Sequence, residues 1–376
     1  MIVLVSNFLN HHQLPFCHAM CRLTDHAFAF VATESVPSER LQMGYHDMNE
    51  NYPFVIRSYE SEESYQRAVE LINSADVVII GSAPESMLKT RKKQNKLILR
   101  YSERLLKQGF QLWKYPIRVW RLHRNNFGSK RIYMLCASAY AAADYRKFFL
   151  YRNKTYRWGY FPEAIHYDDP EALIAQKTAG EIVWVARFLD WKHPEIALEV
   201  AKRLKREGYN FHITMIGNGV LLDEITHRVQ EDALGDCVSI CGAMSPEEVR
   251  QYMETAAIHL FTSDRQEGWG AVLNESMNSA CIPIADAAIG SVPYLIQNGK
   301  NGYAYRGMDD LVDRVKYLLD HPEEQKRLAK RAYATIVEEW NAEVAAARLL
   351  RLAEVLNQNG KCDLFADGVC SRAPVL

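Results

Sequence analysis

The sequence contains the run Asp264-Arg265-Gln266-Glu267-Gly268-Trp269-Gly270-Ala271-Val272-Leu273-Asn274-Glu275. It joins a strand-like segment, 258–261, to a helix-like segment, 272–279, so it predicts a strand–loop–helix junction. Free N–H groups at the start of a helix favour anions, and glycine lets a ligand approach the backbone closely. Glu267 falls in the loop and Glu275 in the helix, eight positions later. The two acids are therefore placed to hold two ends of one ligand, with its phosphates on the amides between them.

This run resembles the Glu-x7-Glu motif of the retaining GT-B glycosyltransferases of glycosyltransferase family 4. The family form is E-G-[FW]-G-x-x-x-x-E, and every fixed position matches between Glu267 and Glu275. The resemblance implies an α/β protein with two Rossmann-like, doubly wound parallel-sheet domains facing a central cleft. It is stronger over residues 180–320 than over 1–160, and acceptor specificity would reside in the weaker half.

A second element, Arg187-Phe188-Leu189-Asp190-Trp191-Lys192, resembles the R-x4-K element of the same family. A nucleotide diphosphate gains negative charge as its bond to the sugar breaks, and two fixed cations would neutralise that charge. The resemblance therefore implies that Arg187, Lys192 and Glu267 carry the reaction. A loop held by ordinary salt bridges is the alternative for Arg187 and Lys192.

The resemblance also implies a donor site. Glu267 and the amides after Gly268 would hold the sugar hydroxyls, and Glu275 would accept hydrogen bonds from the ribose. The donor-binding residues that we expect are Glu275, Gly268, Trp269, Gly270, Ala271, Val272, Leu273, Gly217, Ala243 and Met244. The sequence has no D-x-D element, so no metal cofactor is expected, and the donor is a nucleotide diphosphate sugar with UDP favoured.

Candidate acceptor residues lie in the first half of the chain. The loop after the strand-like segment 1–5 holds His11 and His12, and Glu103 follows another strand end. Loops at the carboxyl ends of parallel strands meet at the edge where ligands bind. The alternatives are that both histidines are simply polar loop residues and that Glu103 pairs internally with Arg104.

The whole chain fits a globular protein of two domains. It has 376 residues, 48% hydrophobic and 24% charged, with a net charge of −1. Strand-like segments alternate with helical ones, which predicts parallel sheets. We expect an N-terminal acceptor domain, 1–165, and a C-terminal nucleotide-sugar domain, 178–341, joined by an acidic linker. By the resemblance, the final helix, about 342–376, packs back on the first domain, and we expect residues 358–376 to be loosely packed.

No apolar run reaches the ~18 residues of a membrane span, and no basic leader precedes the first strand. The eight cysteines form no C-x-x-C pair and favour reduced core residues in a cytoplasmic protein. Cys362 and Cys370, in the tail, have no assigned role.

Residues 89–131 carry fourteen Lys or Arg against one acid, Glu103, and we call this range the basic segment. Within it Trp113, Ile117 and Trp120 recur at helical spacing. An anionic membrane surface or an anionic acceptor fits this pattern. A solvated basic face with its tryptophans packed inward is the alternative. No nucleic-acid motif accompanies the segment, so we expect no nucleic-acid partner.

These patterns together predict a retaining glycosyltransferase that moves a sugar to a hydroxyl of a glycan or lipid-linked acceptor. It would act in polysaccharide biosynthesis, in the cytoplasm or peripherally on the inner face of the membrane. A non-catalytic nucleotide-sugar-binding protein, and a GT-B epimerase or phosphorylase, are the alternatives. A nicotinamide dehydrogenase is disfavoured because G-x-G-x-x-G is missing. The nucleobase, the sugar, the acceptor and any catalytic base stay open.

Overall fold

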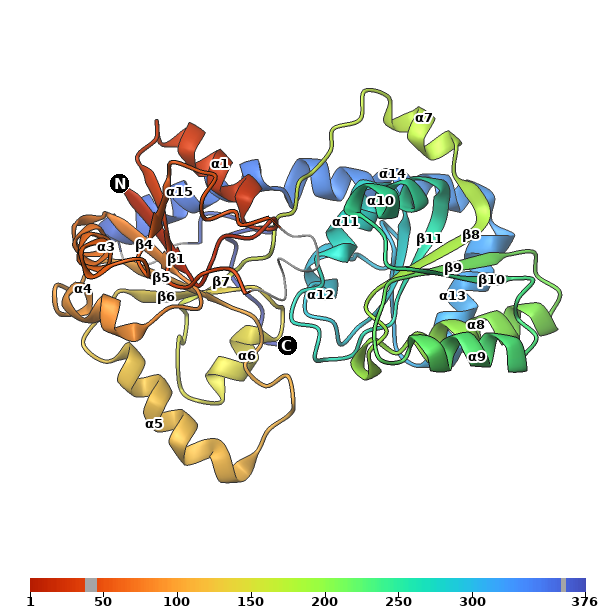
Figure 1. Ribbon diagram of the computed structural model, residues 1–376, viewed down its shortest axis with the longest axis horizontal. Coiled ribbons are helices and arrows are strands. Elements are labelled where there is room, and N and C mark those ends of the chain that lie inside the picture. The colour runs from red at the N-terminus through yellow and green to blue at the C-terminus, as the bar shows by residue number, and fades with distance from the viewer. Residues whose placement is uncertain (38–45, 360–362) are drawn as a thin grey trace. The chain divides into compact units, whose positions relative to one another are not determined.

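The computed structural model describes residues 1–37, 46–359 and 363–376 (Figure 1). They form two compact units. Unit 1 comprises Met1–Glu163 together with Asn341–Leu376, and unit 2 comprises Ala164–Trp340. Each unit is built on its own parallel sheet.

The sheet of unit 1 has seven strands in the order β3-β2-β1-β4-β5-β6-β7. All neighbouring strands run parallel; for example, Leu4 lies beside Phe30 on one side and beside Ile79 on the other. The strands are β1 (Ile2–Ser6), β2 (Phe28–Ala32), β3 (Val55–Arg57), β4 (Val77–Ile80), β5 (Ile98–Ser102), β6 (Ile132–Cys136) and β7 (Thr155–Arg157). The central strands are buried along their whole length, because helices cover both faces of a parallel sheet.

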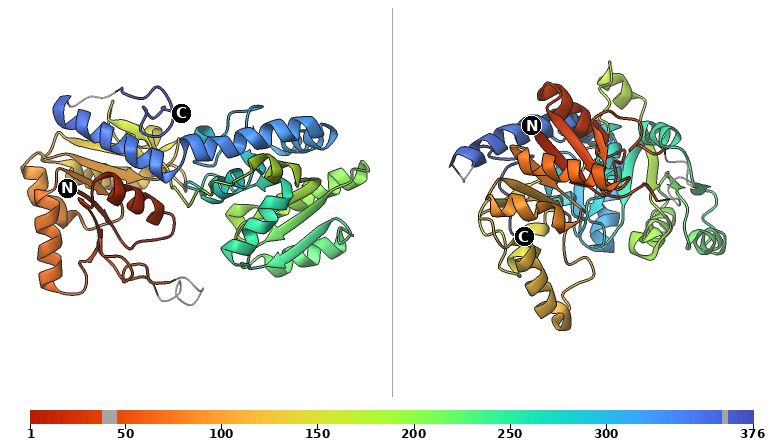
Figure 2. Two further views of the ribbon diagram at one scale, coloured as in Figure 1. Left: turned by 90° about the horizontal axis from the view of Figure 1, so that it is seen from above. Right: turned by 60° about the vertical axis from the view of Figure 1, so that its left-hand side comes forward.

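The helices of unit 1 are α1 (Leu14–Leu23), α3 (Glu62–Ser74), α4 (Lys89–Lys93), α5 (Tyr115–Asn126), α6 (Ala141–Arg146) and α15 (Ala342–Asn359), with 3₁₀ turns η1 (Glu85–Leu88) and η2 (Leu112–Lys114). The last helix, α15, packs against α1, so the end of the chain completes the first unit (Figure 2).

The sheet of unit 2 has six parallel strands in the order β10-β9-β8-β11-β12-β13. The strands are β8 (Thr178–Val185), β9 (His212–Ile216), β10 (Val238–Gly242), β11 (Ala256–Phe261), β12 (Ile282–Asp286) and β13 (Tyr303–Tyr305). Strand β11 is entirely buried at the centre, between β8 and β12.

The helices of unit 2 are α7 (Pro170–Ala175), α8 (Pro194–Arg206), α9 (Leu222–Glu231), α10 (Pro246–Thr255), α11 (Val272–Asn278), α12 (Val292–Leu295), α13 (Met308–Asp320) and α14 (Pro322–Ala334), with the 3₁₀ turn η3 (Asp190–Lys192) and the π-helical turn η4 (Thr335–Glu339). Helix α10 begins with a complete capping box between Ser245 and Glu248, which its sequence predicts. Helix α7 lies within the range expected to be a linker and buries Leu173 and Ile174 in the core of unit 2.

Strands β3, β7 and β13 are absent from the sequence-based prediction, while the longer strands are present in it. Each of these three is three residues long and lies at the edge of its sheet. Such short strands show no periodicity, and edge position leaves them without a continuous apolar run.

The expectation of a loosely packed tail is wrong for residues 368–373. The N–H of Cys370 donates to the carbonyl of Arg157 (2.9 Å), and the N–H of Arg157 donates to the carbonyl of Ser371 (2.8 Å). Val369, Cys370 and Ser371 are buried. The tail therefore pairs with the edge strand β7, and its backbone supplies the hydrogen-bond partners that this edge lacks.

Of the seven cysteines within the described ranges, all but Cys241 are buried. Cys362 lies outside the described residues. Among residues 1–37, 46–359 and 363–376, no helix is both long enough and apolar enough to cross a bilayer.

Candidate active site

The carboxyl edge of the sheet in unit 2 gathers the candidate donor residues. Adjacent strands β10, β9, β8, β11 and β12 all end at this edge, because they are parallel. The loops that follow them contain Ala243, Gly217, Arg187, Glu267 and Gly290 respectively. In open α/β sheets this edge is where ligands bind.

The Arg187 loop rests directly on the loop after β9. A side chain at Gly217 would place its Cβ 1.9 Å from the carbonyl oxygen of Ala186, and one at Gly219 would lie 2.4 Å from that of Phe188. The N–H of Phe188 donates to the carbonyl of Asn218 (2.9 Å). The two glycines are therefore needed to seat the loop that presents Arg187, a role that the lone G-x-G pattern does not reveal.

Arg187 itself is exposed. Its guanidinium makes no hydrogen bond or ion pair with any residue that the structure describes. The salt-bridged alternative is thus wrong for Arg187, whose charge stays available to a ligand at the carboxyl edge.

Lys192 and Glu267 form an ion pair that joins the two predicted motifs. Their side chains are only 11% and 12% exposed. The Lys192 ammonium also lies 4.2 Å from the centre of the Trp191 ring, a cation–π contact. Thr262 donates to the carbonyl oxygen of Lys192 (2.7 Å), and this fixes the backbone behind the ammonium. Lys192 is therefore salt-bridged in this structure, and its partner is the acid of the other motif.

The Glu267 loop is held by close packing and by the loop after β12. Gly270 has φ of +85°, and a Cβ there would lie 2.4 Å from Phe261 and 3.1 Å from the Glu267 side chain. The N–H of Gly290 donates to the carbonyl of Glu267 (3.2 Å). These contacts fix the position of the carboxylate relative to Lys192.

The four amides from Gly270 to Leu273 differ in availability. The N–H of Leu273 donates to the carbonyl of Gly270 (3.0 Å), so this donor is already used. The N–H groups of Gly270, Ala271 and Val272 make no hydrogen bond within the described residues. The expected contribution of Leu273 to the donor site is therefore restricted to its buried side chain.

Trp269 is fully buried. Its indole N–H donates to the Asn274 amide oxygen (2.9 Å), and its ring packs against Tyr294 and Trp340. The side chain thus anchors the loop to the core of unit 2 and is not available to a ligand.

Glu275 lies in α11, beyond these amides. Burial raises the pKa of its carboxyl, while the positive charge of Arg250 opposes this. The carboxylate makes no hydrogen bond with any described residue. A buried carboxylate without a donor is destabilised, and hydroxyl groups of a ligand would supply the missing hydrogen bonds.

Ala243 is exposed, and Met244 is partly buried between β10 and α10. Met244 packs against the same apolar cluster as Val272 and Val185, whose buried members include Val183 and Met253. The loop after β10 and the start of α11 are therefore neighbours, as a shared binding surface requires.

Sequence reasoning missed a second polar cluster beside Lys192. His193 has φ of +51°, and its ring nitrogens lie 2.9 Å from Glu195 and 3.6 Å from Asp264. Burial raises the pKa of Asp286, the neighbouring Asp264 adds to this, and His193 opposes it. The only signal in the sequence is the position of His193 directly after Lys192.

In unit 1 the structure brings together the three candidate acceptor residues. The Tyr160 hydroxyl donates to Glu103 (2.8 Å), and its ring is parallel to that of His12 at 6.3 Å. His11 and His12 lie against each other, 3.8 Å between ring centres. Tyr160, which the sequence analysis did not select, is therefore the residue that links these side chains.

The alternative pairing of Glu103 with Arg104 is not observed. Glu103 forms an ion pair with Lys107, whereas Arg104 lies 3.5 Å from Asp144. Next to this cluster, Gln13 donates to the Tyr101 hydroxyl (2.7 Å) and Ser6 lies 3.2 Å from it. Apart from Asp144, which lies in α6, these groups lie at or just after the carboxyl ends of β1, β5 and β7.

Comparison with known proteins agrees with this arrangement. Residues 168–335 match the family model described as glycosyl transferases group 1. This part of the chain is therefore similar to the group 1 glycosyltransferases. The amylovoran biosynthesis glycosyltransferase AmsK of Erwinia amylovora is 28% identical over 182 residues, 46% of this chain and 44% of that protein.

The putative colanic acid biosynthesis glycosyltransferase WcaL of Escherichia coli is 26% identical to this chain over 196 residues. That match covers 50% of this chain and 48% of WcaL. The chain thus spans less than half the length of these two curated relatives.

Among solved structures, Anabaena HepE in complex with UDP superposes on this chain with a TM-score of 0.68 at 13% identity. The match covers 94% of this chain and 100% of the HepE chain. With two parallel-sheet α/β units, the likeness confirms the predicted GT-B fold.

Proposed function

We propose that this protein is a retaining glycosyltransferase of family 4 that takes a sugar from a nucleotide diphosphate donor, a UDP-sugar by preference. It transfers the sugar to a hydroxyl of a glycan or lipid-linked acceptor in cell-surface polysaccharide biosynthesis. The names of AmsK and WcaL support this role, and the UDP bound in HepE supports the choice of nucleotide.

The ion pair between Lys192 and Glu267 is the observation that carries the proposal. It joins the R-x4-K and Glu-x7-Glu elements, which are 75 positions apart in the sequence, at one point of the carboxyl edge. A diphosphate at this point would take the ammonium of Lys192 as its partner and release Glu267 toward the sugar hydroxyls. Arg187, which is exposed and uncommitted, would supply the second positive charge.

The reaction follows from these positions. The bond between the anomeric carbon and the diphosphate oxygen breaks, and its electron pair leaves with the diphosphate. Arg187 and Lys192 stabilise that developing charge, and the amides of Gly270, Ala271 and Val272 add donors. The acceptor oxygen bonds to the anomeric carbon on the face that the diphosphate leaves, and its proton passes to a diphosphate oxygen. In this step the proton passes between the two substrates, so the protein needs to supply no catalytic base.

Glu275 has a separate task in this proposal. Its buried carboxylate accepts hydrogen bonds from the ribose hydroxyls, and this fixes the nucleotide independently of the sugar. Residues His11, His12 and Glu103 of unit 1 are proposed to orient the acceptor.

The first test is a thermal-shift screen with UDP-, GDP- and ADP-sugars, since a ligand that binds the native state raises apparent stability by mass action. We expect the largest shift with a UDP-sugar. The Glu275→Ala variant should then lose the shift, whereas Glu247→Ala, an exposed acid at the start of α10, should keep it. No shift with any nucleotide sugar would contradict the proposal.

The second test is turnover of the bound donor. Arg187→Ala should lower kcat/KM by about 30- to 900-fold, equivalent to about 2–4 kcal/mol of transition-state stabilisation. Arg206→Ala, also exposed but at the end of α8, is the matched control. An unchanged kcat/KM for Arg187→Ala would refute the phosphate role. Release of nucleotide only when an acceptor is present distinguishes transfer from an epimerase, and donor binding with no turnover would identify a binding protein.

A further inference from the structure

The 3₁₀ turn η2 and helix α5 expose a row of large apolar side chains. Leu112, Trp113, Ile117, Trp120 and Phe127 are 78%, 74%, 67%, 60% and 84% exposed. Residues 113, 117, 120 and 124 recur at spacings of four, three and four, which places them on one face of a helix with 3.6 residues per turn. The alternative in which the tryptophans pack inward is therefore wrong.

The opposite face of α5 is fixed to the body of unit 1. Tyr115 stacks on Phe148, with 5.3 Å between ring centres, and its hydroxyl donates to the Lys147 carbonyl (2.9 Å). Leu122 packs against the core of the unit, and the Tyr151 hydroxyl donates to Asn126 (2.7 Å). The exposed face is thus held outward by the packing of the inner face, at the margin of unit 1 (Figure 1).

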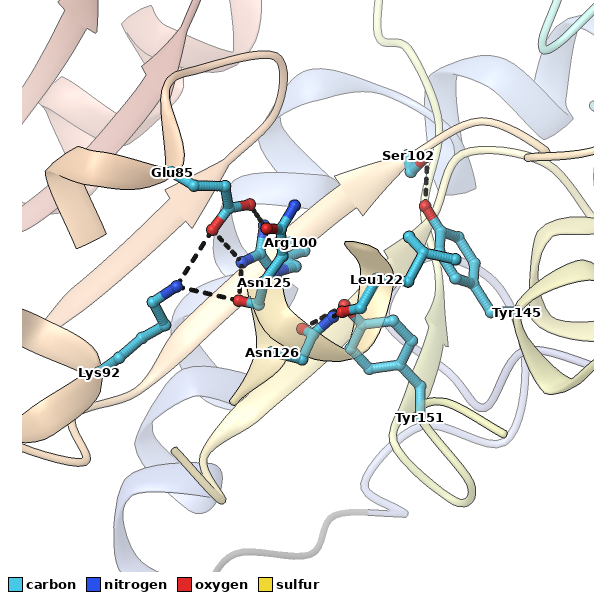
Figure 3. A network of polar contacts seen from close by, with 9 residues as sticks. All are labelled: Glu85, Lys92, Arg100, Ser102, Leu122, Asn125, Asn126, Tyr145 and Tyr151. Atoms are coloured by element: carbon cyan, nitrogen blue, oxygen red, sulfur yellow. Dashed lines mark hydrogen bonds and ion pairs between the residues drawn. The ribbon is translucent and has the colours of Figure 1, made fainter. Parts of the chain in front are cut away.

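A polar network secures the C-terminal end of the same helix (Figure 3). The Asn125 carbonyl accepts hydrogen bonds from Arg100 and Lys92 (both 3.0 Å). Both cations also pair with Glu85. These contacts determine the direction of α5 and at the same time occupy two charges of the basic segment.

The structure divides the basic segment into two parts. Before residue 110 most of the cations serve the fold: besides the pair in Figure 3, Arg91 is buried on carbonyl groups, Arg104 lies beside Asp144 and Lys107 pairs with Glu103. On α5 the cations face solvent. Arg118 and Arg121 have no polar partner among the described residues, and Lys114 and Arg124 lie over the Trp113 and Trp120 rings.

We propose that the exposed face of η2 and α5, which we call the α5 face, docks on an anionic lipid bilayer. The two indole rings and Ile117 enter the region between headgroups and acyl chains, and Lys114, Arg118, Arg121 and Arg124 contact the lipid phosphates. Tryptophan at an interface combines an apolar ring with a polar N–H, and basic residues beside it add attraction to anionic lipids. The inference is independent of the proposed transfer reaction.

Charge selects this occupant over a protein partner or nucleic acid. Across residues 110–131 the sequence has no Asp or Glu, so the α5 face offers only positive charge to whatever covers it. A nucleic acid would use the cations but would not explain outward apolar side chains such as Leu112 and Ile117. A bilayer with anionic headgroups uses both features at once.

The test is co-sedimentation of the full chain with vesicles of phosphatidylcholine alone or mixed with phosphatidylglycerol. We expect binding to the mixed vesicles, with a blue shift of tryptophan fluorescence, and little binding to neutral ones. Raising the salt from about 0.1 M to about 1 M should weaken binding, because the Debye length falls from about 10 to about 3 Å.

Two variants separate the contributions. Trp113→Ala combined with Trp120→Ala should lower the partition coefficient at least about ten-fold. Arg118→Gln with Arg121→Gln should lower it about five-fold per charge. The matched controls are Leu23→Ala, an exposed apolar residue of unit 1, and Arg67→Gln, an exposed cation on α3. All these side chains are exposed except that of Arg118, which is partly exposed, and none lies in the core, so thermal melting should show that the variants remain folded.

The proposal is overturned if the double tryptophan variant binds vesicles as well as the Leu23→Ala control does. It is also overturned if neutral vesicles bind equally well, or if the α5 face mediates dimers by light scattering without lipid. Tighter, tryptophan-dependent binding to single-stranded DNA than to the mixed vesicles would assign the face to nucleic acid instead. Donor binding should be unchanged in the same variants. Measuring it distinguishes failure of the membrane proposal from failure of the transferase proposal.

Discussion

The ion pair between Lys192 and Glu267 gives a quantitative prediction about stability. Removing one partner leaves the other as a poorly compensated charge in a site where both side chains are nearly nine-tenths buried. For fully buried pairs the cost of such a change is about 3–5 kcal/mol. Because this pair retains a little exposure, we expect Lys192→Met to lower the free energy of unfolding by about 3 kcal/mol, the lower end of that range.

The reverse change should cost less. In Glu267→Gln the Lys192 ammonium keeps a hydrogen-bonding oxygen and its contact with the Trp191 ring, so we expect a loss of about 2 kcal/mol. The double variant has no charge left to desolvate. It should therefore cost about 2 kcal/mol less than the sum of the two single changes.

The assay is a double-mutant cycle by urea unfolding, followed by the fluorescence of the tryptophans in unit 2. Lys330 and Glu171 provide the control cycle, since they form an ion pair that is 64% and 67% exposed on the same unit. That pair should show a coupling of about 0.2–1 kcal/mol. The reasoning fails if Lys192→Met costs no more than Lys330→Met, or if the first cycle shows no greater coupling than the second.

Two other predictions concern the packing of unit 2. Gly270→Ala and Gly208→Ala both place a side chain at positive φ, +85° and +79°, at a cost of about 1–2 kcal/mol each. A Cβ added at Gly208 would have no atom within 4 Å, whereas one added at Gly270 would clash with Phe261. Gly270→Ala should therefore lower the free energy of unfolding by about 1–3 kcal/mol more than Gly208→Ala does, and it should weaken UDP binding measured by calorimetry. Equal effects in the two variants would contradict this. Burial lowers the pKa of His259 to about 3 from 6.5. Below pH 6.5 the unfolded state therefore takes up a proton at this residue that the native state does not, and the free energy of unfolding decreases as the pH falls. Between pH 6.5 and 4.5 this amounts to about 2 kcal/mol, and His259→Phe should remove that part of the slope in urea titrations at each pH.

Much of the fold could be predicted from the sequence, because its signals are local. Continuous apolar runs of the length of β1 or β11 indicate buried parallel strands, since both faces of such a sheet are covered. The capping box of Ser245 and Glu248 needs only residues three positions apart, and the structure contains it. The edge strands β3, β7 and β13 were not predictable, because three residues carry no period and their pairing depends on distant neighbours.

The candidate site divides in the same way. The pattern from Glu267 to Glu275 selects the loop, and the R-x4-K spacing selects Lys192 as a second element. Neither pattern reveals that these two charges meet, since 75 positions separate them. The pattern also selects Trp269 as a ligand residue, yet its side chain lies in the core because Tyr294 and Trp340 pack around it.

By itself, then, the sequence determined the class of fold and the chemical types of residue at the candidate donor site, because motif spacing and apolar periodicity are properties of neighbouring residues. The tertiary structure alone decided which partners those residues have. It pairs Lys192 with Glu267, leaves Arg187 free, and turns Trp113 and Trp120 toward solvent. The physical reason is that burial and pairing depend on the packing of segments far apart in the chain, which no local pattern encodes.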